Sequence, residues 1–187
     1  MKYLIVGIGN VGDEYDGTRH NIGFRVLDAF AKASNISFAD RRYGFVGKGR
    51  VRNAEVVLLK PSTFVNASGN AVRYWMNEEK IPIENLLVVV DDISLPVGAI
   101  RMKQSGSSAG HNGLKHIASV LGTEGYNRLR FGIGNDFPRG AQVDYVLGRF
   151  SPEDEKLCDE RSLVAVEAIK AFCLSGMAFA MCHFNNK

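Results

Sequence analysis

The chain has 187 residues and a mass of 20.5 kDa, a size that suits one domain with a full hydrophobic core and is short for two. Its composition, 45% hydrophobic and 23% charged residues, excludes disordered and fibrous classes. The formal net charge of +3 is compatible with a polyanionic partner but does not establish one. We therefore expect a single globular domain over residues 1–187.

The three cysteines, Cys158, Cys173 and Cys182, all lie in the last quarter of the chain. An odd number without spaced pairs argues against a disulfide framework and favours a reducing compartment. The apolar run at the N-terminus breaks at Gly7, too early for a signal peptide, and no later run reaches membrane-spanning length. These features predict a cytoplasmic protein without a membrane segment.

Short apolar runs alternate with segments of helical period, a pattern typical of an α/β domain. Residues 86–90 form the most continuous apolar run and are expected to be the central strand. The other expected strands are 3–8, 43–51, 55–59, 99–103, 127–133 and 143–147, the second and third forming a hairpin. The expected helices are 20–33, 67–76, 112–121 and 152–175, the last preceded by Ser151 as its capping residue.

A glycine-rich cluster, Gly7-Ile8-Gly9-Asn10-Val11-Gly12, follows the first expected strand and fits the dinucleotide pattern G-x-G-x-x-G. In dinucleotide-binding domains the third glycine opens a helix whose N-terminus holds pyrophosphate. Here an acidic, turn-rich segment, residues 13–18, comes next and would repel that group. The sequence therefore argues against nicotinamide binding, and a glycine-rich turn without a ligand remains open.

Two polar residues, His20 and Asn66, lie where helices are expected to begin. The positive end of a helix dipole disfavours imidazolium, so this position would help to keep His20 neutral, the form that a general base needs. Taken alone, His20 is better explained as a surface histidine near a helix cap, and Asn66 fits a simple N-cap. Neither residue establishes a site by itself.

Two acids, Asp91 and Asp92, end the buried strand, at the edge of an α/β sheet where ligands usually bind. Because neighbouring strand residues point to opposite faces, at most one of them is expected to face a site. The small-residue loop 104–113 follows and leads into a helix, as an anion-binding loop would. Its residues 106–110 also match the nucleophile elbow G-x-S-x-G, with Asp144 and His183 in triad order, but no buried strand precedes it.

The histidines and cysteines lack the spacing of metal ligands, so no metal is expected, and nothing in the sequence requires a cofactor. Together, the polar clusters resemble the bacterial-type peptidyl-tRNA hydrolases. The match runs in order from Tyr3 to about Phe150. The segments that carry it are residues 7–10, 15–23, 60–69, 91–98, 110–114 and 128–134.

This resemblance implies a monomeric, three-layer α/β/α domain around a twisted, mixed and mostly parallel sheet. It also implies hydrolysis of the ester between a peptide and the 3′ ribose of tRNA, with peptidyl-tRNA as partner and no obligatory protein partner. A noncatalytic RNA-binding homologue of the same fold is the alternative, which would leave the coincidence of polar clusters unexplained.

By position, the resemblance implies that His20 is the catalytic base and that Asp91, rather than Asp92, is its partner. The residues that it implies for substrate binding are Asn10, Tyr15, Asn66 and Asn112. The tRNA backbone is expected to lie along Lys103 and Arg130. Further candidates for this footprint are Arg19, Arg101, Lys115 and Arg128.

Overall fold

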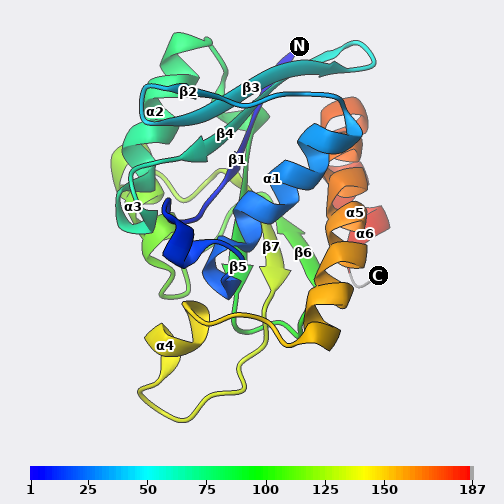
Figure 1. Ribbon diagram of the computed structural model, residues 1–187. Coiled ribbons are helices and arrows are strands. Elements are labelled where there is room, and N and C mark those ends of the chain that lie inside the picture. The colour runs from blue at the N-terminus through cyan, green and yellow to red at the C-terminus, as the bar shows by residue number, and fades with distance from the viewer. Residues whose placement is uncertain (186–187) are drawn as a thin grey trace.

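The computed structural model describes residues 1–185, and within that range it contains a seven-stranded sheet covered by helices (Figure 1). The order of the strands across the sheet is β2-β3-β4-β1-β5-β7-β6. Their bounds are β1 Lys2–Gly7, β2 Ala39–Arg41, β3 Gly44–Val51, β4 Ala54–Pro61, β5 Leu86–Asp92, β6 Ile100–Lys103 and β7 Asn127–Gly132.

The sheet is mixed. Strands β4, β1, β5 and β7 are parallel neighbours, whereas β2–β3, β3–β4 and β6–β7 are antiparallel pairs. All strands except β3 and β6 therefore run in the same direction, which confirms a mixed and mostly parallel sheet. The middle position belongs to β1 and not to β5, so the expectation for 86–90 is wrong by one place. Residues 3–7 of β1 and 86–90 of β5 are buried and carry no charged side chain, so composition does not distinguish these two runs.

The helices form a layer on each face of the sheet, which confirms the three-layer architecture. One hydrophobic core joins the sheet to α1, α5 and α6, and a second core joins the opposite face to α2 and α3. Alternate residues of β1 divide between them: Ile5 belongs to the first core, and Leu4 and Val6 belong to the second. The bounds are α1 Ile22–Ala33, α2 Ser68–Glu78, α3 Asn112–Leu121, α4 Gln142–Val146, α5 Pro152–Ser175 and α6 Met177–Phe184.

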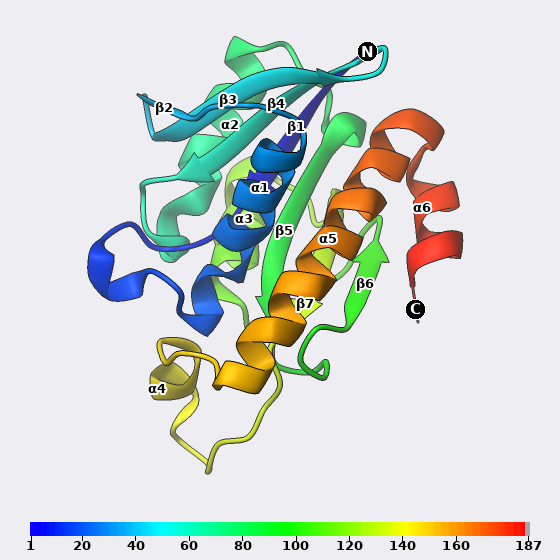
Figure 2. The ribbon, with the colours of Figure 1, turned by 45° about the vertical axis from the view of Figure 1, so that its right-hand side comes forward.

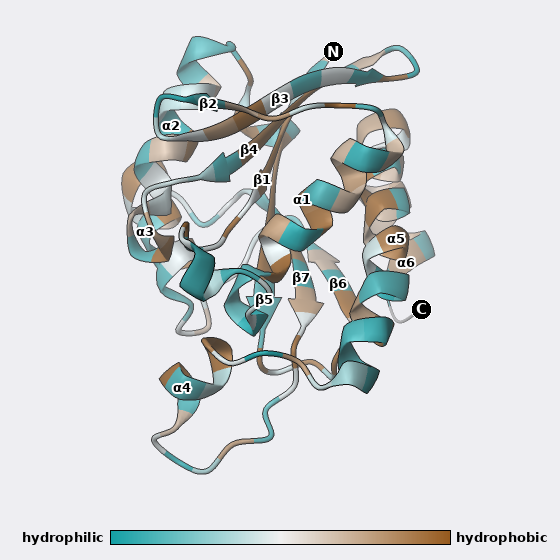
Figure 3. Ribbon diagram, viewed as in Figure 1, coloured by the Kyte–Doolittle hydropathy of each residue, from teal (hydrophilic) through white to brown (hydrophobic). Residues whose placement is uncertain are grey.

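The long helix α5 begins as the sequence predicts. Ser151 is the N-cap, and its side-chain oxygen accepts a hydrogen bond from the Asp154 N–H at 3.1 Å. Three acids in the first turn lie near the positive end of the helix dipole, and Figure 3 shows this end of α5 in teal. No helix of the described residues is long and apolar enough to cross a membrane.

The expected strand at residues 143–147 is wrong, because this segment forms the short helix α4. Tyr145 holds it in place by donating its hydroxyl to the Ile133 carbonyl at 2.6 Å.

The outer edge of β6 is covered by the side chain of Asn185. This side chain accepts a hydrogen bond from the Met102 N–H at 2.6 Å and donates one to the Met102 carbonyl at 3.0 Å. Figure 2 shows α6 beside β6. Neither α6 nor the short strand β2 was expected from the sequence.

The first helix approaches the sheet closely through two glycines. A Cβ on Gly7 would lie 2.3 Å from the Gly23 carbonyl oxygen, and one on Gly23 would lie 2.7 Å from the Val89 carbonyl oxygen. Any side chain at either position would push α1 away from β1 and β5. The contact therefore brings the segment just before α1 to the carboxyl ends of these strands.

Candidate active site

A pocket of about 350 Å³ opens at the carboxyl ends of the parallel strands. This edge is where open α/β sheets bind their ligands. The walls come from the segments that follow β1, β4 and β5, the loop before α3, and α4. The polar lining residues are Asn10, His20, Asn66, Asp91, Asp92, Ser108, His111, Asn112, Arg130 and Gln142.

His20 lies in a 3-10 turn, Arg19–Asn21, that leads into α1, so the α-helix begins two residues later than expected. Its Nδ1 lies 2.8 Å from Asp91 Oδ2, and the two side chains are 16% and 3% exposed. An ionised carboxylate can only accept hydrogen bonds, so Nδ1 of His20 carries the proton that is shared with Asp91. In the neutral ring the other nitrogen, Nε2, is therefore unprotonated and able to accept a proton.

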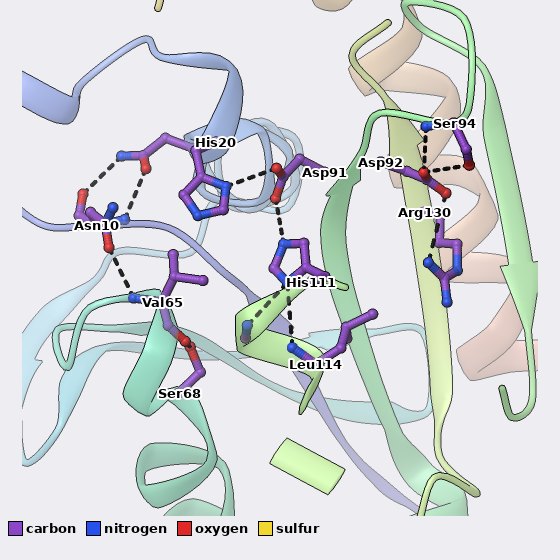
Figure 4. Close-up of polar contacts among 12 residues, drawn as sticks. Asn10, His20, Val65, Ser68, Asp91, Asp92, Ser94, His111, Leu114 and Arg130 are labelled. Carbon is purple, nitrogen blue, oxygen red and sulfur yellow. Dashed lines mark hydrogen bonds and ion pairs between the residues drawn. The ribbon is translucent and has the colours of Figure 1, made fainter. Parts of the chain in front are cut away.

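Asp91 ends β5 between two histidines (Figure 4). Its Oδ2 accepts from His20, and its Oδ1 accepts from Nε2 of His111, also at 2.8 Å. Burial alone would raise the pKa of Asp91, but His111 and His20 together outweigh burial and hold the pKa well below its ordinary value. Asp91 is thus a buried carboxylate that stays ionised. Its neighbour Asp92 is bonded to the N–H and hydroxyl of Ser94 and not to a histidine. Both acids nevertheless line the pocket, contrary to the expectation that at most one would face a site.

The carboxylate also determines how His20 titrates. Burial lowers the pKa of His20, but the charge of Asp91 and the hydrogen bond to it raise it more, so the net shift is upward. The expectation that the start of α1 would favour the neutral ring is therefore wrong in direction. The upward shift comes from the Asp91 carboxylate 2.8 Å away, a partner that the start of a helix does not indicate.

His111 joins the dyad to α3 and was not identified as a site residue from the sequence. It is the N-cap of α3, and its Nδ1 accepts from the N–H groups of Gly113 and Leu114 at 3.1 and 3.4 Å. An accepting Nδ1 has no proton, so Nε2 is the nitrogen that donates to Asp91. Only its position directly before an expected helix could have indicated the capping role, and nothing local indicates the contact with Asp91.

Asn10 is held in the pocket wall by three hydrogen bonds. Its backbone N–H and carbonyl bond the side chain of buried Asn21, each at 2.8 Å, and its Oδ1 accepts from the Val65 N–H at 2.9 Å. The amide nitrogen Nδ2 of Asn10 is left to bind a ligand. Asn21 is a second residue that sequence reasoning missed, although its only role here is to position Asn10.

The other predicted substrate-binding residues lie at the rim of the pocket or near it. Asn66 is exposed in the 3-10 turn Val65–Ala67 and does not cap α2, so the N-cap interpretation is wrong. Asn112 is the exposed first residue of α3. Tyr15 does not line the pocket, but its ring meets Phe64, which does, edge to face with centroids 6.2 Å apart.

Of the two cations predicted to bind tRNA, only Arg130 reaches the pocket. Its Nη2 donates to the Ser107 carbonyl at 2.8 Å, and its buried Nε has no hydrogen-bond partner among residues 1–185. Lys103 is exposed on the edge strand β6 and does not line the pocket.

Two further candidates for the tRNA footprint, Arg128 and Arg19, make contacts within the protein. Arg128 is 1% exposed and donates to the carbonyls of Gly106, Glu124 and Tyr126. Arg19 lies over the Tyr145 ring at 4.0 Å and donates to its carbonyl, which holds α4. The Arg128 guanidinium is buried and used by the protein, so the expectation that it contacts phosphates is wrong. Arg19 has a buried Nε without a hydrogen-bond partner among residues 1–185, so its contact with phosphate stays a prediction.

His20, Asp91 and His111 are also the group of potential metal ligands found within the described residues, with ligand atoms within 4.8 Å of one another. The fit to a metal is poor. Both nitrogen–oxygen distances are 2.8 Å, a hydrogen-bond length, whereas ligands at about 2.0–2.2 Å from zinc in tetrahedral geometry lie roughly 3.3 Å apart. The two ring protons occupy the space that an ion would need.

The two competing motif interpretations do not match the geometry. Gly12 is followed by a 3-10 turn, Asp13–Tyr15, and not by an α-helix that could hold pyrophosphate. In the elbow motif, Ser108 lines the active-site pocket, whereas His183 lines a different one. Neither a dinucleotide site nor a serine triad is formed.

A buried histidine–carboxylate dyad, placed with amide side chains at the carboxyl edge of a three-layer α/β sheet, defines the chain as a candidate acid–base enzyme. The model of the family described as peptidyl-tRNA hydrolase matches residues 4–187. The chain belongs to the peptidyl-tRNA hydrolase family and is an enzyme of that class.

Named peptidyl-tRNA hydrolases are similar to this chain over nearly its full length. A peptidyl-tRNA hydrolase of Bacteroides fragilis is 63% identical over 187 residues, with all of both chains covered. One of Halalkalibacterium halodurans is 43% identical, covering 97% of this chain and 99% of the relative. The crystal structure of peptidyl-tRNA hydrolase from Acinetobacter baumannii superposes with a TM-score of 0.93 at 32% identity, covering 98% of this chain and 94% of that one.

Proposed function

We propose that the chain hydrolyses the ester between a peptide and the 3′ ribose of tRNA and that His20 is its general base. The observation that carries the proposal is the hydrogen-bonded chain His20–Asp91–His111, which leaves Nε2 of His20 as the free basic nitrogen. Family membership supplies the substrate class. Because its proposed substrate is a tRNA used in translation, we propose that the enzyme acts in the cytoplasm. We also propose that it acts as a monomer.

In the proposed reaction His20 Nε2 takes a proton from a water, and the oxygen of that water attacks the ester carbonyl. The tetrahedral intermediate then expels the 3′ oxygen, which receives the proton back from the imidazolium. The products are a peptide carboxylate and a free tRNA 3′ hydroxyl. Asp91 fixes the ring tautomer and stabilises the imidazolium while it exists.

A direct attack by water is favoured because the pocket supplies no activated nucleophile. The Ser108 carbonyl accepts from the His111 N–H at 2.9 Å, but within the described part of the chain the Ser108 hydroxyl makes no hydrogen bond to a histidine side chain. Cys158 and Cys173 are buried elsewhere, and burial raises the pKa of each thiol to about 12. A covalent intermediate is therefore not part of the proposal.

The amides are proposed to bind the groups around the ester. Nδ2 of Asn10 and the side chain of Asn66 would bind the peptide and the 3′ end, and Asn112 would bind the attacking water or the developing oxyanion. An amide offers both donors and an acceptor, which matches a peptide group. An enzyme that requires this match discriminates against a free aminoacyl ester, whose ammonium cannot make the same bonds.

Arg130 and Lys103 are proposed to contact tRNA phosphates, Arg130 at the pocket and Lys103 further out on β6. The buried Nε of Arg130 lacks a hydrogen-bond partner in residues 1–185, while Nη1 lies 3.7 Å from Asp92 Oδ2, so a phosphate would bind Arg130 in competition with this carboxylate. Tyr15 would act through its contact with Phe64 at the rim.

The test is release of tRNA from N-acetyl-aminoacyl-tRNA by the wild type and by His20→Ala. General-base catalysis contributes about 10²–10⁴-fold, so the variant is expected to lose about that much in kcat. Near-normal turnover by a folded His20→Ala variant would refute the role of His20. Equal wild-type rates on acetylated and free aminoacyl-tRNA would refute the role of the amides.

A further inference from the structure

A second groove, of about 660 Å³, lies at the opposite end of the sheet from the active site. It is formed by the last residues of α1, the turn between β3 and β4, the end of α5, and α6. Figures 1 and 2 both place these segments together at the end of α1 that is remote from His20. Since α1 has 12 residues at about 1.5 Å each, the groove is roughly 18 Å from the catalytic end of that helix.

One wall of the groove presents a pair of stacked rings. Phe179, which is 44% exposed, and His183 lie with centroids 4.0 Å apart and planes inclined by 24°. His183 Nδ1 donates to the Phe179 carbonyl at 3.0 Å, which fixes the ring and leaves Nε2 free. The apolar lining continues along Val51, Ala171, Leu174 and Phe184. The groove wall therefore carries a partly exposed stacked aromatic pair beside an apolar floor.

The rim of the groove is cationic. Arg50 and Arg52 line it from the β3–β4 hairpin and Lys170 lines it from α5, against one acid, Glu167. Lys170 lies 3.7 Å from Glu167, and Arg50 makes an exposed pair with Glu55 at 3.0 Å, a kind of contact that holds a side chain weakly.

Arg52 has no carboxylate partner within residues 1–185, and it is held at the turn with a φ of 53°. This left-handed conformation is uncommon for a residue other than glycine, asparagine or aspartate. The rim thus offers one fully available guanidinium and two loosely paired cations.

We propose that this groove is a second RNA site, which binds one or two unpaired nucleotides. A base would stack on the Phe179–His183 pair, and its phosphates would lie between Arg52 and Lys170. Proteins that bind single-stranded nucleic acid combine these two features, an aromatic platform and a cationic track. An acidic peptide would satisfy the cations but would leave the flat surface without a matching ring. The proposal does not depend on ester hydrolysis, because the groove contains none of the pocket residues.

The first experiment locates bound RNA. A hexaribonucleotide with one 4-thiouridine, which has no ester to cleave, is irradiated with the protein, and the cross-linked peptide is identified by mass spectrometry. The proposal expects a cross-link in the segment that contains Phe179 and His183, reduced by excess unlabelled hexa-adenylate. Cross-links confined to the active-site loops would overturn it.

The second experiment measures affinity by fluorescence anisotropy with labelled hexa-adenylate. Phe179→Ala and Arg52→Ala are each expected to weaken binding at least about fivefold, since a stacked base contributes on the order of 1–3 kcal/mol. The matched control is Arg73→Ala, which removes an exposed arginine from α2 on the other face of the sheet. Arg73→Ala is expected to leave the affinity unchanged.

A third measurement separates this groove from the active site. Hydrolysis of an N-acetyl-aminoacyl ester of a short CCA oligonucleotide, which spans only the pocket, is expected to be equal in wild type, Phe179→Ala and Arg52→Ala. Unchanged hexa-adenylate affinity in both groove variants, or an equal loss in Arg73→Ala, would overturn the proposal. Equally tight binding of hexaglutamate, lost in the same variants, would overturn it in favour of an acidic peptide.

Discussion

Asp91 Oδ1 and His111 Nε2 lie 2.8 Å apart, and the other ring nitrogen of His111 receives two N–H groups from the first turn of α3. The carboxylate that orients His20 is thereby tied to the helix that carries Asn112. His20, the proposed proton acceptor, and the side-chain amide of Asn112 are thus connected through Asp91 and His111, although they come from distant parts of the chain. Four predictions follow from this arrangement and from its surroundings.

The first concerns pH. Since His20 must be neutral to act, kcat/KM of the wild type is expected to rise with pH through a pKa above the ordinary value of His20. Asp91→Asn removes the charge that raises this pKa, so the rise is expected at lower pH. The plateau is expected to fall by about a hundredfold or more, because an amide does not fix the tautomer. pH–rate profiles check both, and a rise moved to higher pH would contradict the assignment.

The second uses a pair of variants at His111. His111→Asn keeps a good capping residue but cannot reach Asp91, whereas His111→Ala loses both functions. Both are expected to lower kcat to a similar extent. Only His111→Ala is expected to lose an additional ~0.5–2 kcal/mol in the free energy of unfolding, the usual contribution of an N-cap. Denaturant titrations and steady-state kinetics separate the effects, and full activity of His111→Asn would exclude its positioning role.

The third distinguishes a phosphate contact from a structural arginine. Lys103→Ala is expected to reduce the slope of log affinity for tRNA against log salt by about 0.7–0.9, with little change in stability. Arg128→Leu leaves the carbonyls of Gly106, Glu124 and Tyr126 without their donors, so it is expected to destabilise the fold by several kcal/mol. For Arg128→Leu, the slope of log tRNA affinity against log salt, measured below the unfolding temperature of the variant, should equal that of the wild type. The opposite pattern would reverse the two assignments.

The fourth concerns backbone strain at the pocket rim. Phe64 is 48% exposed and has φ 61° and ψ 159°, a region that is essentially restricted to glycine. Phe64→Gly is therefore expected to be about 1 kcal/mol more stable than Phe64→Ala, the reverse of the usual order of these residues. Both variants lose the ring that meets Tyr15, so both are expected to raise KM equally. Thermal unfolding of the two variants provides the test, and a more stable Phe64→Ala would rule out strain.

Strands β1, β4 and β5 were predictable because they are largely buried and have nearly unbroken apolar runs. The hairpin of β3 and β4 and the capped start of α5 also have local signals. Residues 143–147 do not: their apolar positions fit either a strand or one turn of helix. The segment forms a helix because of the tertiary contacts that Tyr145 makes with Ile133 and Arg19.

The site was predictable where a side chain acts at its own position in a motif, as for His20, Asp91 and Asn10, which do come together. It was not predictable where a residue is defined by a distant partner. The sequence around His111 indicates only that a helix begins there. Its contact with Asp91 joins residues 20 positions apart in the chain. Arg128 reads as a basic residue of an alternating strand, yet three loop carbonyls bury it. The roles of all these residues in turnover stay predictions.

The two hydrogen bonds from Asn185 to Met102 give the last residues of the chain a protective role. Without them β6 would present unsatisfied amide and carbonyl groups along its outer side, an open template on which another chain could add a strand. A protein truncated before Met177 would therefore be prone to self-assembly even if its catalytic groups remained in place. Asn185 and the neighbouring helix α6 thus act as a cover for the outer edge of β6.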